Sequence, residues 1–144
     1  MLECAAKRPS DEVLKDVLTK YHRVAVVGLS SKKERDSNRV AGYLLDHGYE
    51  VIPVNPVEEE VLGQKSYPDL ASVPGPLEIV DVFRRSDQVE PVAAEAVRLG
   101  AKVLWLQEGV KNAAAAAQAE KAGLVVVEDT CMKVKHQKLL GGQL

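Results

Sequence analysis

The stretch Arg23-Val-Ala-Val-Val-Gly28 decides the fold of this 144-residue chain. It is a short apolar run rich in β-branched residues, which predicts a strand that is buried on both faces. Strands of this kind belong to parallel sheets that are covered by helices on both sides. The run ends at a glycine, whose lack of a side chain would let a ligand approach the backbone, and the polar segment 29–37 that follows is interpreted as a loop.

Four further apolar runs repeat this pattern and predict strands at 50–56, 77–83, 102–107 and 124–127. Helical spacing or alanine content predicts helices at 10–21, 38–47, 86–99, 112–122 and 130–140. We therefore expect one α/β domain over 1–144, with a first helix at about 10–21 and a core at about 23–140. The predicted fold is doubly wound and Rossmann-like: a five-stranded parallel sheet, order 3-2-1-4-5, with helices on both faces. Pro53 cannot donate to a ladder, so the second strand should be short or near the edge.

Composition excludes several classes of protein. Hydrophobic residues make up 46% of the chain, which indicates a globular protein and excludes a disordered tail. The formal net charge of −2 gives no support for nucleic-acid or membrane-surface binding. Cys4 and Cys131 fit neither a disulfide framework nor a zinc site. Without an apolar leader or spanning segment, we expect a cytoplasmic protein. The lack of a metal-ligand cluster predicts that it needs no metal. We expect Trp105 in the core and His22, His47 and His136 at the surface.

Ligands of open parallel sheets bind beyond the carboxyl ends of the strands. Here those ends supply the segments 28–32, 54–56, 82–85 and 106–109, which we expect to face one crevice. The loop after Gly28 is the most informative, because it combines hydroxyl groups, positive charge and the N-terminus of the next helix. We interpret it as an anion site formed by Ser30, Ser31, Lys32, Lys33, Arg35 and Arg39, with a solvated basic loop as the alternative.

The dinucleotide fingerprint is incomplete in this sequence. A nicotinamide site has Gly-x-Gly-x-x-Gly after the first strand, whereas this chain has Gly28-x-Ser30-x-x-Lys33. The acidic residue that holds the ribose diol is replaced by Val54-Asn55-Pro56 at the end of the second strand. Both differences disfavour NAD as the ligand.

Several segments resemble those of the small CoA-binding domain proteins, whose fold is seen in the N-terminal domain of the succinyl-CoA synthetase α subunit. The matching segments are Val24-Ala-Val-Val-Gly-Leu-Ser30, Gly48-Tyr-Glu-Val-Ile-Pro-Val-Asn-Pro56, Gly63-Gln-Lys65, Asp81-Val-Phe-Arg-Arg85, Lys102-Val-Leu-Trp-Leu-Gln-Glu-Gly109 and Cys131-Met-Lys133. The resemblance implies binding of coenzyme A, or an acyl-CoA, through its ADP moiety.

The resemblance also implies a role for each position. Gly28, Ser30, Ser31 and Lys32 would hold the diphosphate, and Arg35 or Arg39 the pyrophosphate or the 3′-phosphate. Asn55 and Pro56 would lie near the ribose or its phosphate. Val82, Phe83 and Arg84 would form a wall on the adenine side, and Gln107 to Gly109 would lie along the path of the pantetheine.

We find no catalytic arrangement of Ser, His and Asp, no acid and base pair and no metal-ligand cluster in the sequence. The leading hypothesis is therefore a CoA or acyl-CoA binding protein without catalysis of its own. The alternatives are an NAD(P)-dependent or acyl-CoA-transforming enzyme, and a CoA-sensing subunit of a larger ligase. Cys131 is either a small buried hydrophobe or a thiol near the CoA thiol.

Overall fold

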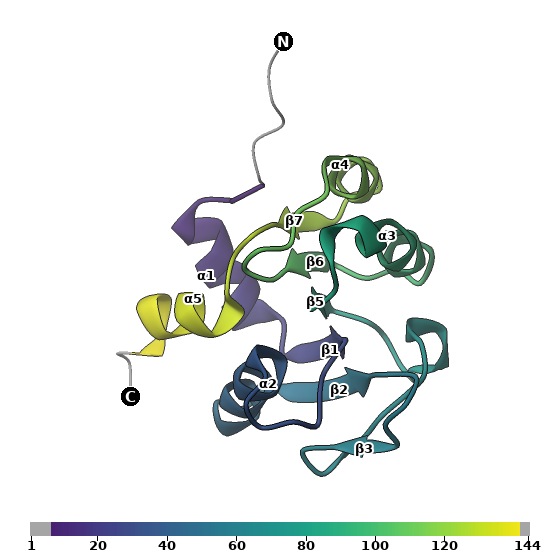
Figure 1. Ribbon diagram of the computed structural model, residues 1–144. Helices are drawn as coiled ribbons and strands as arrows, with labels where there is room; N and C mark the ends of the chain where they lie inside the picture. The colour runs from purple at the N-terminus through teal and green to yellow at the C-terminus, as the bar shows by residue number, and fades with distance from the viewer. Residues whose placement is uncertain (1–6, 142–144) are drawn as a thin grey trace.

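The computed structural model describes residues 7–141 and contains a parallel sheet between two layers of helices (Figure 1). The strands are β1 (Arg23–Val27), β2 (Glu50–Val54), β5 (Ile79–Val82), β6 (Val103–Leu106) and β7 (Val125–Val127). All of their pairings are parallel. The strands β3 (Glu60–Val61) and β4 (Gln64–Lys65) form a separate antiparallel hairpin. The predicted fold class is confirmed.

The strands lie side by side in the order β2-β1-β5-β6-β7. Beyond β2, Tyr67 extends the sheet through a parallel bridge to Val54, and its N–H donates to the Pro53 carbonyl at 3.0 Å. Counting this segment as the third strand gives the predicted pattern 3-2-1-4-5, followed by β7. The residues that occupy these positions differ from the prediction. The stretch 77–83 was predicted to be the third strand, at the edge beside β2, but it forms β5, which pairs with β1 and takes the fourth position. A single bridge has no apolar periodicity, so the sequence did not reveal it.

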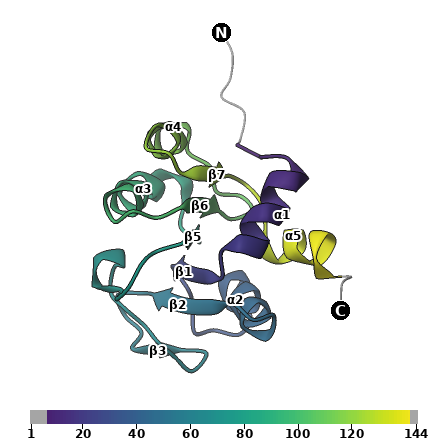
Figure 2. The same cartoon turned by 180° about the vertical axis from the view of Figure 1, so that it is seen from behind.

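Three helices cover one face of the sheet: α1 (Asp11–Lys20), α2 (Asp36–Asp46) and α5 (Met132–Leu139). The other face is covered by α3 (Val89–Arg98), α4 (Ala113–Lys121) and the 3₁₀ turn η1 (Leu70–Ser72). A second 3₁₀ turn, η2 (Ser86–Gln88), leads into α3. Figures 1 and 2 show these two layers on either side of the strands. None of the helices within residues 7–141 is long and apolar enough to cross a membrane.

The helix ends follow from local side-chain chemistry. Ser10 caps α1 by accepting from the Val13 N–H, and Asn112 caps α4 by accepting from the Ala115 N–H. Helix α2 begins at Asp36, two residues before the predicted start at residue 38. Its N-cap residue, Arg35, makes no side-chain capping bond, so the first turn carries no sequence signature of a helix start.

The two faces bury different side chains. The α3 and α4 face has small residues at its helix contacts, with Ala93, Ala96, Ala115, Ala116 and Ala119 fully buried. The opposite face holds larger side chains, including Trp105 and Met132. Trp105 lies in the core as predicted, and its indole N–H donates to the Thr130 carbonyl at 2.8 Å.

Candidate functional site

The site is centred on the carboxyl ends of β1 and β5, which are neighbours in the sheet. The chain leaves β1 toward α2 on one face and leaves β5 toward α3 on the other, so this is the switch point where ligands bind in such folds. Gly28 follows β1 and has a φ of +87°. A Cβ atom at Gly28 would lie 2.4 Å from the Phe83 carbonyl oxygen. Only glycine therefore fits where the two strands end.

The loop after Gly28 is held by short polar contacts. The Ser30 N–H donates to Ser37 Oγ at 3.0 Å, and the Lys32 N–H donates to Ser30 Oγ at 3.1 Å. Asn38 Nδ2 donates to the Ser30 carbonyl at 2.9 Å. Ser37 and Asn38 are buried, whereas Lys32 and the rest of the segment 31–36 are exposed. The loop backbone is thus fixed from below while its charged side chains face solvent.

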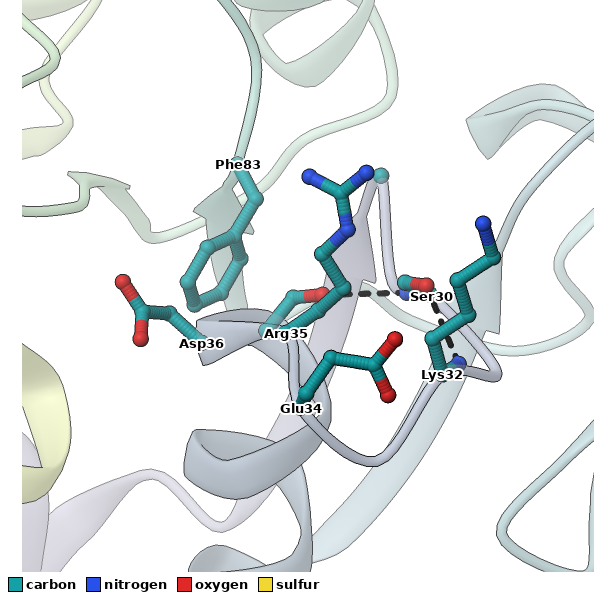
Figure 3. Close-up of a pocket in the computed structure, with 8 residues that line it drawn as sticks. Ser30, Lys32, Glu34, Arg35, Asp36 and Phe83 are labelled. Carbon is teal, nitrogen blue, oxygen red and sulfur yellow. Dashed lines mark hydrogen bonds between the residues drawn. The ribbon is translucent and has the colours of Figure 1, made fainter.

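A pocket of about 650 Å³ lies on this loop, and we call it the loop pocket. In Figure 3 the Lys32 ammonium and the Arg35 guanidinium extend on the same side of the loop. The first turn of α2 also borders the pocket, and its N–H groups favour anions. Carboxylates of Glu34 and Asp36 lie in the same lining, so the pocket is mixed in charge. The full lining is Gly28, Ser30, Lys32, Glu34, Arg35, Asp36, Ser37 and Phe83.

A second pocket of about 480 Å³ adjoins the first and shares Asp36 and Phe83 with it. We call it the helix pocket, because α2 and α5 form its walls. Arg39 lines this pocket, forms an ion pair with Asp36, and donates from Nη1 to the Glu34 carbonyl at 2.6 Å. The rest of the lining is Val40, Gln107, Glu108, Val110, Cys131, Lys133, Val134 and Gln137.

A third, smaller pocket of about 180 Å³ lies on the α3 side of the switch point. The ends of β1 and β2 contribute Val27 and Val54, and the guanidinium-bearing Arg84 lies at its edge. Its lining is mostly apolar, with Leu70, Pro68, Pro91 and Val92 beside Asp69 and Glu95. The predicted residues are thus divided among three neighbouring pockets.

The other predicted site residues lie outside these three pockets. Ser31 Oγ donates to Glu58 at 2.6 Å. Asn55 Nδ2 donates to the Leu29 carbonyl at 2.9 Å, and the exposed Pro56 follows it. The Val82 side chain is fully buried in the core. These contacts support the loops that border the pockets.

Gly109 also lies outside the pockets. Its N–H donates to Asp129 Oδ1 at 2.7 Å, and this bond, followed by contacts with Arg8, holds the pKa of the Asp129 carboxyl below its usual range. The bond ties the loop after β6 to the segment after β7, which leads into α5. Gly109 therefore helps to set the position of one wall of the helix pocket.

Sequence reasoning missed several lining residues. In the loop pocket these are Glu34, Asp36 and Ser37, because the helix was predicted to start at residue 38. In the helix pocket they are Val40, Val110, Lys133, Val134 and Gln137. Val40 is buried on α2, but no local sequence pattern indicates that α5 packs beside α2 to form this pocket.

A buried histidine and a buried carboxyl group lie on the α2 and α5 face. His136 was predicted at the surface, but it is only 7% exposed because α5 packs against α2 at this residue. Asp81 is fully buried on β5, its two carboxyl oxygens have no hydrogen-bond partner, and burial raises its pKa well above the usual range. His22 is exposed as predicted, whereas His47 is half-buried. Among residues 7–141, no group of three His, Cys, Asp or Glu side chains is placed to hold a metal ion.

Comparisons with known proteins match residues 22–137 to the family described as the CoA binding domain. The uncharacterized protein YneT of Bacillus subtilis (strain 168) is 42% identical over 130 residues, which cover 90% of this chain and 96% of YneT. A hypothetical protein from Pyrococcus horikoshii OT3 has a similar structure, with a TM-score of 0.91 and 43% identity, over 98% of this chain and all of that one.

A more distant likeness shows the fold alone. The apo form of the dinucleotide-forming acetyl-coenzyme A synthetase 1 of Ca. Korarchaeum cryptofilum has a TM-score of 0.69 and 23% identity. The match covers 79% of this chain and 27% of the synthetase. The family match spans most of the sequence and includes the loop and strand ends that border all three pockets. The chain therefore belongs to the CoA binding domain family.

Proposed function

We propose that this protein binds coenzyme A or an acyl-CoA through the ADP moiety, with the diphosphate in the loop pocket. The observation that carries the proposal is the close approach of two backbones at the switch point. Gly28 leaves the floor of the pocket open to a ligand, since its position admits no side chain. Lys32, Arg35 and the free N–H groups at the start of α2 supply donors and positive charge above that floor, beside the carboxylates of Glu34 and Asp36.

The proposal assigns the surrounding residues by position. Phe83 lies between the loop pocket and the helix pocket, and Arg84 lies at the third pocket. We expect the adenine and ribose to lie toward Arg84 and Asn55, at the ends of β5 and β2. Arg39 is paired with Asp36, so we expect its contribution to the phosphates to be smaller than that of Arg35.

The proposed function is binding without a reaction of its own. The Ser30 and Ser37 hydroxyls accept hydrogen bonds from the loop backbone. In the described part of the chain, no histidine lines the loop pocket to activate them. This arrangement supports recognition of a ligand better than nucleophilic catalysis.

Titration calorimetry with CoA tests the proposal. We expect Lys32→Ala and Arg35→Ala each to weaken CoA binding about tenfold. A hydrogen bond to a charged group contributes about 1.5 kcal/mol or more, and about 1.4 kcal/mol corresponds to a tenfold change in affinity. Lys33→Ala is the matched control, since it removes an equal charge from the same loop outside the pocket lining. Binding of CoA should also weaken as salt rises.

Two results would reject the proposal. The first is the absence of binding heat at millimolar CoA. The second is an equal loss of affinity in Lys33→Ala and Lys32→Ala, which would indicate general charge attraction in place of a defined site. Tight NADPH binding that CoA does not displace would instead favour the oxidoreductase alternative.

A further inference from the structure

Helices α2 and α5 are joined by a cluster of ring side chains that we call the histidine clamp: Tyr43, His47, Tyr49 and His136. Tyr43 Oη lies 2.7 Å from His136 Nδ1. The His47 ring stacks on Tyr43 with centroids 3.9 Å apart, and its Nδ1 lies 2.8 Å from the Tyr43 carbonyl oxygen. His136 meets the rings of His47 and Tyr49 edge-on, at centroid distances of 5.2 Å and 5.6 Å.

The clamp lies next to the helix pocket. Val40 of α2 lines that pocket, and Tyr43 follows it by three residues, about one helical turn. On α5 the pocket residue Lys133 precedes His136 by the same spacing. The walls of the pocket and the clamp are therefore formed by adjoining parts of the same two helices, and Gln137, which follows His136, also lines the pocket.

The surroundings of His136 favour its neutral form. Lys133 lies over the Tyr43 ring, 5.7 Å from its centroid, and His47 is the other nearby group that gains positive charge. Burial raises the pKa of Tyr43, and burial followed by Tyr43 raises that of Tyr49 to about 12, so both tyrosines stay neutral. On the α1 side, Asp11 pairs with Lys135 and Lys138 of α5. Within residues 7–141, His136 forms no hydrogen bond or ion pair with a carboxylate.

We propose that the histidine clamp is a pH-sensitive closure of the helix pocket: a proton on His136 releases α5 from α2 and widens the pocket. A neutral ring can accept the Tyr43 hydroxyl proton at Nδ1, whereas a doubly protonated ring can only donate, so the bond to Tyr43 must reverse its direction. The added charge also lies in a buried position next to the His47 ring, and no carboxylate within residues 7–141 pairs with it. The cost of burying this charge and its repulsion by His47 therefore weaken the attachment of α5 to α2.

The direction of the pH dependence follows from linkage. Burial, followed by the charge of His47, lowers the pKa of His136 below its ordinary value of 6.5. Above pH 6.5 the ring is neutral in both the closed and the released states, and the clamp is at full strength. As the pH falls below that value the released state binds the proton first, so the closed state loses stability until the pH reaches the lowered pKa.

Hydrogen exchange of the ligand-free protein tests the clamp directly. After correction for intrinsic exchange, we expect amides of α5 to lose about tenfold protection between about pH 7.5 and about pH 5. His136→Gln should abolish this pH dependence, and Tyr43→Phe should weaken protection at the higher pH. His22→Gln is the matched control, because it removes an exposed histidine whose ring lies tilted beside Tyr49, with centroids 5.1 Å apart, but which has no contact with His136 among the ring pairs of the clamp. Wild-type behaviour in His136→Gln overturns the proposal.

Where a variant disturbs the fold, proton NMR of the wild-type imidazoles gives a second answer. The proposal requires His136 to titrate below the ordinary histidine value of 6.5, and the α5 amide shifts to change with the same midpoint. A His136 midpoint at or above 6.5 overturns it. A separate measurement, which rests on the proposed function, is the affinity for CoA at each pH. As the pH is lowered, the CoA affinity of the wild type should fall more than that of His136→Gln. If CoA does not bind at all, the proposed function fails while the exchange result still decides the clamp.

Discussion

The two faces of the sheet are made by alternate residues of the same strands, yet they differ in chemistry. The face under α3 and α4 is lined by alanine and aliphatic side chains. The face under α1, α2 and α5 contains the buried acid Asp81 and the buried base His136, together with Trp105. The loop pocket and the helix pocket both open beside α2. The α2 and α5 face thus combines packing with ionisable groups inside the sheet. On the other side the third pocket is mostly apolar, and the buried Glu128 lies at the start of α4, where it accepts from the Asn112 N–H at 2.6 Å.

The largest expected effect on stability comes from Gly28, at the strand ends where the chain leaves for the two faces of the sheet. Gly28→Ala places a Cβ atom against the Phe83 carbonyl oxygen at a positive φ, so the backbone must shift. We expect the free energy of unfolding to fall by about 2–4 kcal/mol. Urea titration checks this, with Gly48→Ala as the control, because Gly48 has the same φ of +87° but no atom within 4 Å of the added Cβ. Equal losses in the two variants would show that backbone conformation alone sets the cost.

The next effect concerns the buried acid Asp81, whose replacement is expected to raise the stability of the protein. Asp81 packs between Val26 and Trp105 in the register of the sheet, without a hydrogen-bond partner. Replacing it by leucine should raise the free energy of unfolding at about pH 8 by about 1–3 kcal/mol, since an unsatisfied buried polar group is removed.

The pH dependence makes the Asp81 prediction specific. Because burial raises the folded-state pKa of Asp81, its cost is smallest below the unfolded-state value of 3.8 and grows as the pH rises toward the folded-state pKa. Denaturant titrations from about pH 4 to about pH 8 should show a steeper loss of stability in the wild type than in Asp81→Leu. Parallel pH curves would mean that Asp81 finds a partner in solution.

The packing face gives the third effect, without any pH dependence. Ala119 of α4 is fully buried, so Ala119→Leu should lower stability by about 1–3 kcal/mol through overpacking. The matched control is Ala117→Leu, because Ala117 is exposed on the same helix and the substitution changes helix propensity equally. CoA affinity should be equal in both variants, because neither residue lines a pocket described above. A drop in affinity for Ala119→Leu alone would show that the two faces are coupled.

The sequence predicted most of the fold because each main strand is an apolar run long enough to show its period. The segment at Tyr67 was missed because one bridge leaves no such pattern. The surface prediction for His136 was wrong for a related reason: lysines on both sides make α5 look solvated, and only the packing of α5 against α2 buries the histidine.

The candidate site was predicted in part. The strand-end rule indicated the loop pocket, and Gly28, Ser30, Lys32 and Arg35 line it. The same rule expected one crevice, whereas within residues 7–141 the strand ends border the loop pocket and the helix pocket, which share Asp36 and Phe83, and the third pocket on the α3 side. Their walls come from helices whose relative placement is not encoded in any local pattern.

By itself the sequence determined the alternation of buried strands and amphipathic helices, the glycine at the first strand end and the basic loop that follows it. Apolar periodicity and turn chemistry are local, so they can be read along the chain. Tertiary structure alone decided that Phe83 stands over Gly28, that Arg39 pairs with Asp36, and that His136 meets Tyr43. Those contacts join residues that are close in space through the crossovers of the sheet, and their energies depend on burial that no single segment specifies.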